Sequence, residues 1–159
     1  MQFKPLPVPP DTLDRLERIR RSLPREAAPE VDCCSRVIEQ TDVGERDVAG
    51  EWIVFLRALD LASNDAEGYR RTETRIDPHR LGTAFRERIV DVDAVLAELE
   101  SADVPVDADT LRARVNRSTT TGERTGFDSR DDPDRVRRIL EWAELFDLIE
   151  RVDDGFRSV

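Results

Sequence analysis

The sequence predicts a mainly α-helical protein with small β-hairpins, built from two consecutive copies of one unit. Three observations support this prediction. The chain repeats itself, so that Asp60 falls on Asp147 at an offset of 87 residues. An amphipathic helix precedes the matching region in each copy, and a polar turn that ends in glycine follows it. The predicted unit therefore ends in helix, strand, turn and strand.

The repeat is clearest at the end of each copy. Residues 57–72 (RALDLASNDAEGYRRT) align without a gap with residues 144–159 (ELFDLIERVDDGFRSV). In this alignment Gly68-Tyr69-Arg70 falls on Gly155-Phe156-Arg157. Self-similarity at a fixed offset indicates a duplicated structural unit.

Apolar residues at steps of three and four mark the helix of each copy. They are Val48, Trp52, Phe55, Leu56 and Leu59 in the first copy, and Ile139, Trp142, Ala143 and Phe146 in the second. The segments 65–68 and 153–155 then have the composition of hairpin turns, because glycine readily adopts the positive φ that tight turns need. Each helix is therefore expected to lead into a two-stranded hairpin.

The first copy resembles the winged helix-turn-helix family. Residues 33–41 are predicted to be helical, Asp42-Val43-Gly44 breaks the pattern, and a second helix starts near Glu45. The resemblance implies a turn at Thr41–Gly44, a recognition helix at Glu45–Leu59 and a wing at Ser63–Tyr69. An opening helix from Thr12 to Leu23, with Asp11 as its N-cap, completes the unit. Together with a proline-rich arm it gives a first domain at 1–76.

The second winged-helix unit is predicted at 77–159. Asp77-Pro78 and Asp132-Pro133 each place a capping residue before a proline, which predicts helix starts near 78 and 133. The expected elements are one helix at 81–102, a short helix at 107–117, a helix at 133–148 and a wing at 149–158. A polar segment near 117–131 predicts a mobile insert, far longer than the turn of the family.

Charge and composition bound the environment. The chain has 35 acidic residues against 25 basic ones, for a net charge of −10, and Lys4 is its only lysine. This composition resembles that of proteins from halophilic archaea, which accumulate salt. In molar salt the Debye length is about 3 Å, so a negative charge does not exclude an approach to DNA. The sequence has neither an apolar run of membrane-spanning length nor a signal-peptide pattern, so we expect a cytoplasmic protein with no membrane partner.

Catalysis is not expected, because the residues that carry it are scarce. The chain has one histidine, two adjacent cysteines, no glycine-rich phosphate loop and no metal-ligand spacing. We therefore predict no catalytic residue, no metal and no cofactor. Cys33 and Cys34 have two interpretations, as small buried apolar residues or as a redox or metal-responsive pair. The first is the more common in proteins.

The winged-helix resemblance implies a DNA-binding protein of the transcription-regulator type, with double-stranded DNA as its partner. Arginines on the recognition helices and wings are the expected DNA contacts: Arg46, Arg70, Arg71, Arg75, Arg135, Arg137, Arg138 and Arg157. The first recognition helix also carries Glu45, Asp47 and Glu51, which make a poor phosphate-facing surface. The alternative is therefore a protein-interaction module or scaffold subunit, a role that tandem winged helices also have.

A stripe of apolar residues within 85–99 has two interpretations. The residues step by four and three: Phe85, Ile89, Val92, Leu96 and Leu99. Such a stripe is usually the buried face of a domain's own helix. Alternatively it is the seam of a homodimer, which would suit a palindromic DNA site.

Overall fold

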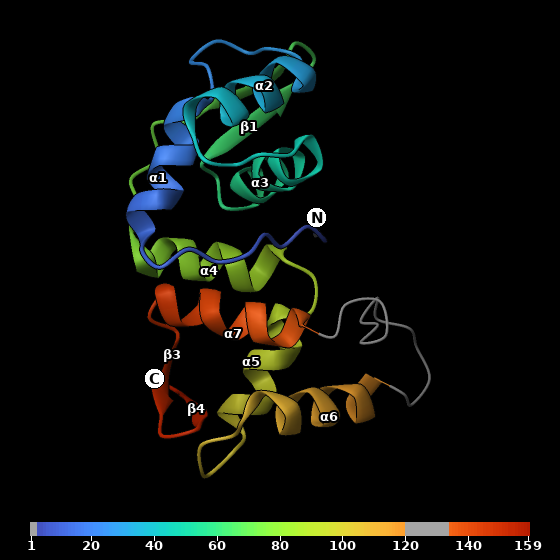
Figure 1. The fold of residues 1–159 in the computed structure, drawn as a ribbon. Coiled ribbons are helices and arrows are strands. Elements are labelled where there is room, and N and C mark those ends of the chain that lie inside the picture. Colours follow the sequence, from blue (N-terminus) through green and yellow to red (C-terminus); the bar gives the residue numbers. More distant parts are fainter. Residues whose placement is uncertain (1–2, 120–133) are drawn as a thin grey trace. The chain divides into compact units, whose positions relative to one another are not determined.

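The computed structural model describes residues 3–119 and 134–159 (Figure 1). The described residues form α-helices and two separate antiparallel hairpins, which confirms the predicted mainly helical fold with small β-hairpins. The chain divides into two compact units, Met1–Asp77 and Pro78–Val159, here called unit 1 and unit 2.

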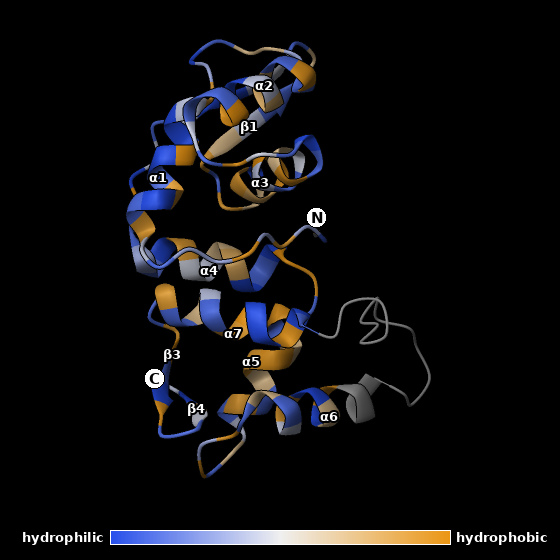
Figure 2. Ribbon diagram, viewed as in Figure 1, coloured by the Kyte–Doolittle hydropathy of each residue, from blue (hydrophilic) through white to orange (hydrophobic). Residues whose placement is uncertain are grey.

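Unit 1 contains three helices followed by one hairpin. The elements are α1 (Leu13–Ser22), α2 (Glu30–Gln40), α3 (Arg46–Ala58), β1 (Ala62–Asp65) and β2 (Gly68–Arg71). The apolar side of α3 is fully buried, with Ile53, Phe55 and Leu56 inaccessible to solvent. Figure 2 shows polar and apolar residues alternating along α1, the pattern of a helix that packs one side inward. Packing of these apolar sides forms the core of unit 1.

Unit 2 contains four helices followed by the second hairpin. The elements are α4 (Pro78–Arg88), α5 (Val92–Glu100), α6 (Ala108–Thr119), α7 (Arg135–Leu145), β3 (Ile149–Val152) and β4 (Gly155–Ser158). In its core the ring of Phe146 lies 5.3 Å from that of Phe85 and 5.6 Å from that of Trp142. All three rings are buried. This aromatic cluster packs α4 against the end of α7.

The two units match residue by residue in their hairpins and in the turns that lead into them. Strands β1 and β2 pair Ser63 with Arg70, and β3 and β4 pair the matching residues Glu150 and Arg157. Asp60 and Asp147, which lie two residues after the ends of α3 and α7, both have positive φ, at 64° and 59°. Asp and Asn tolerate this left-handed conformation better than most residues. The same backbone turn therefore joins helix to hairpin in both units.

A third extended segment flanks each hairpin, and the sequence did not reveal it. Ala28 forms an antiparallel bridge with Tyr69 in unit 1, and Val106 forms the matching bridge with Phe156 in unit 2. The amide of Ala28 donates to the carbonyl of Tyr69 at 3.0 Å, and the amide of Tyr69 donates back at 2.8 Å. One bridging residue is too short a segment to show an alternating pattern. Each bridge fixes the wing to the segment that precedes a helix.

The predicted single helix at 81–102 is wrong. The helix ends at Arg88, and α5 begins at Val92 after a left-handed Asp91 with φ 76°. The apolar stripe continues across this break, so its spacing alone could not reveal it. All five stripe residues are buried, at 3% exposure or less. The stripe is therefore part of the core, the more common of the two interpretations.

Several predicted boundaries differ by a few residues. Thr12, not Asp11, precedes α1, and it makes no side-chain capping bond. Helix α2 begins three residues before the predicted start at Cys33. Asp132-Pro133 lies outside the described residues, as does the predicted insert beyond Thr119, whereas 117–119 belong to α6.

Candidate nucleic-acid interface

Unit 1 contains a helix-turn-helix made by α2 and α3. The hydroxyl of Thr41 donates to the carbonyl of Val37 at 2.6 Å and accepts from the amide of Val43 at 3.2 Å. Val43 is buried beneath the turn. These contacts close the turn that the sequence predicted at Thr41–Gly44.

The exposed surface of this helix-turn-helix is acidic. Residues 30–58 hold seven acids against three arginines. The acids are Glu30, Asp32, Glu39, Asp42, Glu45, Asp47 and Glu51, and the arginines are Arg36, Arg46 and Arg57. Two of these arginines are engaged within the unit: Arg36 donates to the carbonyl of Ser22 at 2.9 Å, and Arg57 lies over the ring of Phe3 at 5.3 Å. The recognition helix of unit 1 thus offers exposed Arg46 among carboxylates.

The matching helices of unit 2 have the opposite charge. Residues 108–119 and 134–145 hold six arginines against four acids. The arginines are Arg112, Arg114, Arg117, Arg135, Arg137 and Arg138, and the acids are Asp109, Asp134, Glu141 and Glu144. The two helix pairs have the same place in their units but present opposite signs of charge.

Helices α6 and α7 share a small surface hollow of about 70 Å³. Arg112 of α6 and exposed Arg137 of α7 line it, together with Asp109 and Asp134. In the part of the chain that the structure describes, Arg137 makes no ion pair. Its guanidinium is therefore available to a phosphate oxygen, which arginine can bind through two N–H groups.

Arg135 is not available to DNA, which corrects its expected role. Its side chain is only 8% exposed, and its Nε lies 3.1 Å from a carboxylate oxygen of Asp91. Its Nη2 also donates to the carbonyl of Val90 at 2.9 Å. Arg135 therefore lies on the inner side of α7, whereas Arg137 lies on its outer side and Arg138 is half-buried.

The wing arginine of unit 2 is already paired. Arg157 forms an ion pair with Glu150 on the adjacent strand. Nearby, Arg151 lies over the ring of Phe156 at 4.8 Å and pairs with Glu144 at 3.4 Å. Both arginines are exposed, so solvent weakens these pairs. The wing of unit 2 nevertheless presents little net positive charge.

The expected arginines of unit 1 divide into two groups. Arg71 has an internal role, because its Nη1 donates to the carbonyl of Arg21 at 2.8 Å near the end of α1. Arg46, Arg70 and Arg75 are exposed. They lie on three different segments, at the start of α3, on β2 and after β2.

Arg112 and Arg114 were not selected from the sequence, although they belong to an arginine-rich run. Their contribution depends on α6 packing beside α7. The sequence did not predict that α6 and α7 pack together, because the predicted insert between them was too long for a helix-turn-helix turn. The spacing of the arginines along α6 was the sequence signal that could have identified them as candidate DNA contacts.

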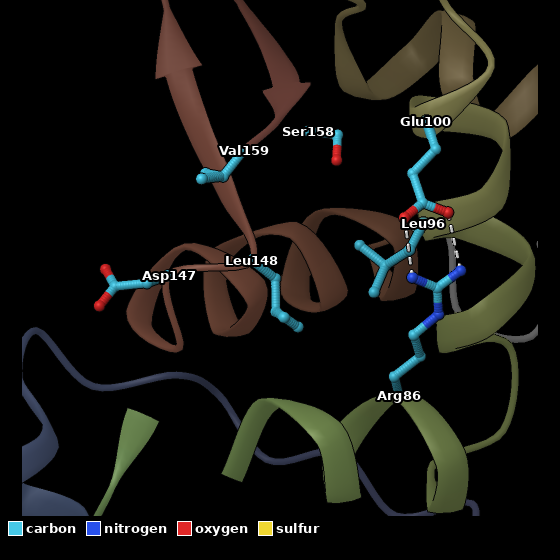
Figure 3. A pocket seen from close by; sticks show the side chains of 7 residues that line it. All are labelled: Arg86, Leu96, Glu100, Asp147, Leu148, Ser158 and Val159. Carbon is cyan, nitrogen blue, oxygen red and sulfur yellow. Dashed lines mark hydrogen bonds and ion pairs between the residues drawn. The ribbon is translucent and has the colours of Figure 1, made fainter. Parts of the chain in front are cut away.

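A second hollow in unit 2 is unsuited to an anion (Figure 3). It measures about 180 Å³, and Leu96 and Leu148 contribute apolar walls. The guanidinium of Arg86 in this hollow is held by both carboxylate oxygens of Glu100, at 2.8 and 2.9 Å, and by Asp93 at 2.7 Å. Hydrogen bonds from Arg86 lower the pKa of Glu100. The cluster ties α4 to α5.

The two cysteines are buried, Cys33 fully and Cys34 to 7% exposure. The thiol of Cys33 is directed at the carbonyl oxygens of Ala28 and Tyr69, at 3.5 and 3.7 Å. Burial is the main cause that raises the pKa of both thiols. Among the described residues no three His, Cys, Asp or Glu side chains are grouped to hold a metal ion. The described helices also include none long and apolar enough to cross a membrane.

The helix order, the closed turn of unit 1 and the two wings define a tandem winged-helix protein. The chain belongs to the halobacterial double winged helix domain family, whose model matches residues 1–159. Searches of curated proteins and of solved structures found no match. The family match confirms both the tandem architecture and the resemblance to proteins of halophilic archaea.

Proposed function

We propose that this protein is a cytoplasmic, non-enzymatic DNA-binding protein of the transcription-regulator type, and that unit 2 makes the main contact with the duplex. In this proposal α7 faces the DNA and α6 lies beside the backbone. Arg112, Arg114, Arg137 and Arg138 supply phosphate contacts. Arg135 is removed from the predicted contacts because it is buried and paired.

The opposite charge of the two matched helix pairs carries the proposal. A duplex presents a dense array of phosphates, and its affinity for a protein depends strongly on arginines and lysines that neutralise them. Counted over the helices alone, α2 and α3 carry five acids against three arginines, whereas α6 and α7 carry six arginines against three acids, or five against three without the buried Arg135. In a chain of net charge −10, a surplus of arginines on these two helices is the feature that favours a polyanion.

The test is the salt dependence of duplex binding. Fluorescence anisotropy with a labelled duplex, repeated over a series of KCl concentrations, gives the slope of the logarithm of affinity against the logarithm of salt concentration. Each lost phosphate contact is expected to reduce the steepness by about 0.9. The variant Arg112→Ala/Arg137→Ala should therefore bind more weakly and with a slope shallower by about 2.

The matched control is Arg18→Ala/Arg46→Ala, which removes two exposed arginines from unit 1. It changes the net charge equally, and we expect its slope to equal that of the wild type. Two results contradict the proposal: a wild type that binds no duplex at any salt concentration, or an equal loss of slope in both double variants.

The second candidate is a protein-interaction module, and the acidic helix-turn-helix of unit 1 favours it. Acids and exposed Arg46 on the recognition helix suit a protein partner better than phosphates. A co-purification from native-salt lysate that yields a stoichiometric protein partner, with no duplex binding by the wild type, would favour this candidate over the first.

A further inference from the structure

The two wings differ at one matched pair of residues. In unit 2, Glu150 lies across the hairpin from Arg157 and forms an ion pair with it. In unit 1 the same register places Ser63 opposite Arg70, so the carboxylate is replaced by a hydroxyl. Within residues 3–119 and 134–159, Arg70 has no acidic partner, and its side chain is exposed. The wing of unit 1 thus keeps a positive charge that the wing of unit 2 neutralises.

Backbone contacts place further arginines beside this strand. The amide of Arg71 donates to the carbonyl of Pro24 at 2.9 Å, and its guanidinium donates to the carbonyl of Arg21 at 2.8 Å. These bonds hold the end of α1 and the segment after it against β2. Arg25 follows Pro24 directly and is exposed. Over the described part of the chain Arg25 also makes no ion pair.

We name the group of Arg21, Arg25 and Arg70 the β2 basic surface, and Arg71, whose guanidinium is bonded within the unit, is not part of it. Two acidic residues lie close to these arginines and reduce the net positive charge of the surface. Glu17 accepts from the Nε of Arg21 at 3.2 Å, and Glu26 is exposed next to Arg25. Arg21 is 74% exposed, so its pairing with Glu17 leaves the guanidinium open to solvent. The surplus remains positive, and it belongs to α1, the segment after it and β2, not to the acidic recognition helix.

We infer that unit 1 binds the phosphate backbone of duplex DNA through the β2 basic surface, and not through α3. The inference rests on the proposed function, because it takes the same ligand. Arginines that contact phosphates position a protein on DNA without reading its sequence. Unit 1 would therefore add affinity and salt dependence, while base recognition would be left to unit 2.

The experiment compares four proteins by duplex anisotropy over the same KCl series. They are the wild type, Arg25→Ala/Arg70→Ala, the control Arg18→Ala/Arg46→Ala and the unit 2 variant Arg112→Ala/Arg137→Ala. Arg25→Ala/Arg70→Ala and Arg18→Ala/Arg46→Ala remove the same charge from unit 1, and they differ only in which arginines are lost. We expect the slope of Arg25→Ala/Arg70→Ala to be shallower by about 2 and that of Arg18→Ala/Arg46→Ala to be unchanged.

A further variant, Ser63→Glu, keeps every arginine and recreates in unit 1 the cross-strand pair of unit 2. It should make the slope shallower by about 1. Circular dichroism of each variant establishes that it is folded.

The outcomes separate the two proposals. Equal slopes for Arg25→Ala/Arg70→Ala and for its control overturn the inference, and if the unit 2 variant still loses slope the proposed function stands. A loss of slope in Arg25→Ala/Arg70→Ala but not in the unit 2 variant supports the inference and overturns the assignment of DNA contact to α6 and α7. A wild type that binds no duplex overturns both.

Discussion

The guanidinium of Arg135 and the carboxylate of Asp91 form a buried ion pair, with Nε and a carboxylate oxygen 3.1 Å apart. Their side chains are only 8% and 4% exposed. Asp91 is the left-handed residue between α4 and α5, and Arg135 is the first residue of α7. The pair therefore fixes the start of α7 to the break between two other helices. At the matching place in unit 1 stands Val48, so this tie belongs to unit 2 alone.

Replacing Arg135 by methionine should destabilise unit 2 strongly. The substitution leaves the Asp91 carboxylate buried without its partner, a change that costs about 3 to 5 kcal/mol in proteins. Urea unfolding followed by the fluorescence of Trp142, in a Trp52→Phe background, measures the loss in unit 2. The exposed neighbour provides the control: Arg137→Met should change the unfolding free energy by about 0.5 kcal/mol or less. Similar losses in both variants would contradict a structural role for Arg135.

The matched glycines of the two wings should respond differently to alanine. Gly68 has φ 127°, and an added Cβ would overlap the carbonyl oxygen of Ala28. Gly155 has no positive φ, and an added Cβ would lie 3.1 to 3.2 Å from the backbone of Val106. We expect Gly68→Ala to cost more than about 2 kcal/mol, and Gly155→Ala clearly less. Thermal unfolding of the two variants gives the order, and a reversed order would refute the described wing geometry.

Stability should fall in alkaline solution because of the buried thiols. Burial raises the pKa of Cys33 and Cys34 in the folded protein above the ordinary value of 9.0. The unfolded chain then releases these protons first, so the stabilisation present below pH 9 is lost as the pH rises through the folded pKa values. The fall between about pH 8 and pH 10 should be smaller in Cys33→Ala/Cys34→Ala. Burial also raises the pKa of Tyr69, which remains in both proteins. An identical pH dependence of the two unfolding free energies would be evidence against the prediction.

Freeing the wing arginine of unit 2 should strengthen duplex binding. The substitution Glu150→Ser removes the carboxylate that pairs with Arg157 and copies the arrangement of Ser63 and Arg70 in unit 1. One more arginine then becomes available for a phosphate, so the salt dependence should steepen by about 0.9. The side chains of Arg157 and Glu150 are 59% and 44% exposed, so the fold should keep its stability within about 0.5 kcal/mol. An unchanged or shallower slope would argue that this wing does not approach the duplex.

The sequence was sufficient for features that depend on local pattern. The repeat placed both hairpins within a residue or two of where they lie, because Gly68 and Gly155 end turns that only a few residue types can form. The turn at Thr41–Gly44 was likewise readable from its glycine and the interrupted apolar spacing. These signals depend on residues close together in the chain.

Features that depend on tertiary packing could not be predicted from the sequence. The left-handed Asp91 interrupts a helix whose apolar spacing continues, and its partner Arg135 is distant in sequence. For the same reason the sequence could not separate buried Arg135 from exposed Arg137, two residues further along α7. Charge composition predicted an arginine-rich region, whereas the packing of α6 beside α7 determines which arginines face outward.

The central claim is that unit 2, and not the recognition helix of unit 1, contacts duplex DNA, and hydrogen–deuterium exchange with and without a duplex tests it most directly. Amides at the start of α7 and along α6 should exchange more slowly in the complex, while those of α3 should exchange at their free rates. Protection of α3 in place of α6 and α7 would contradict the claim.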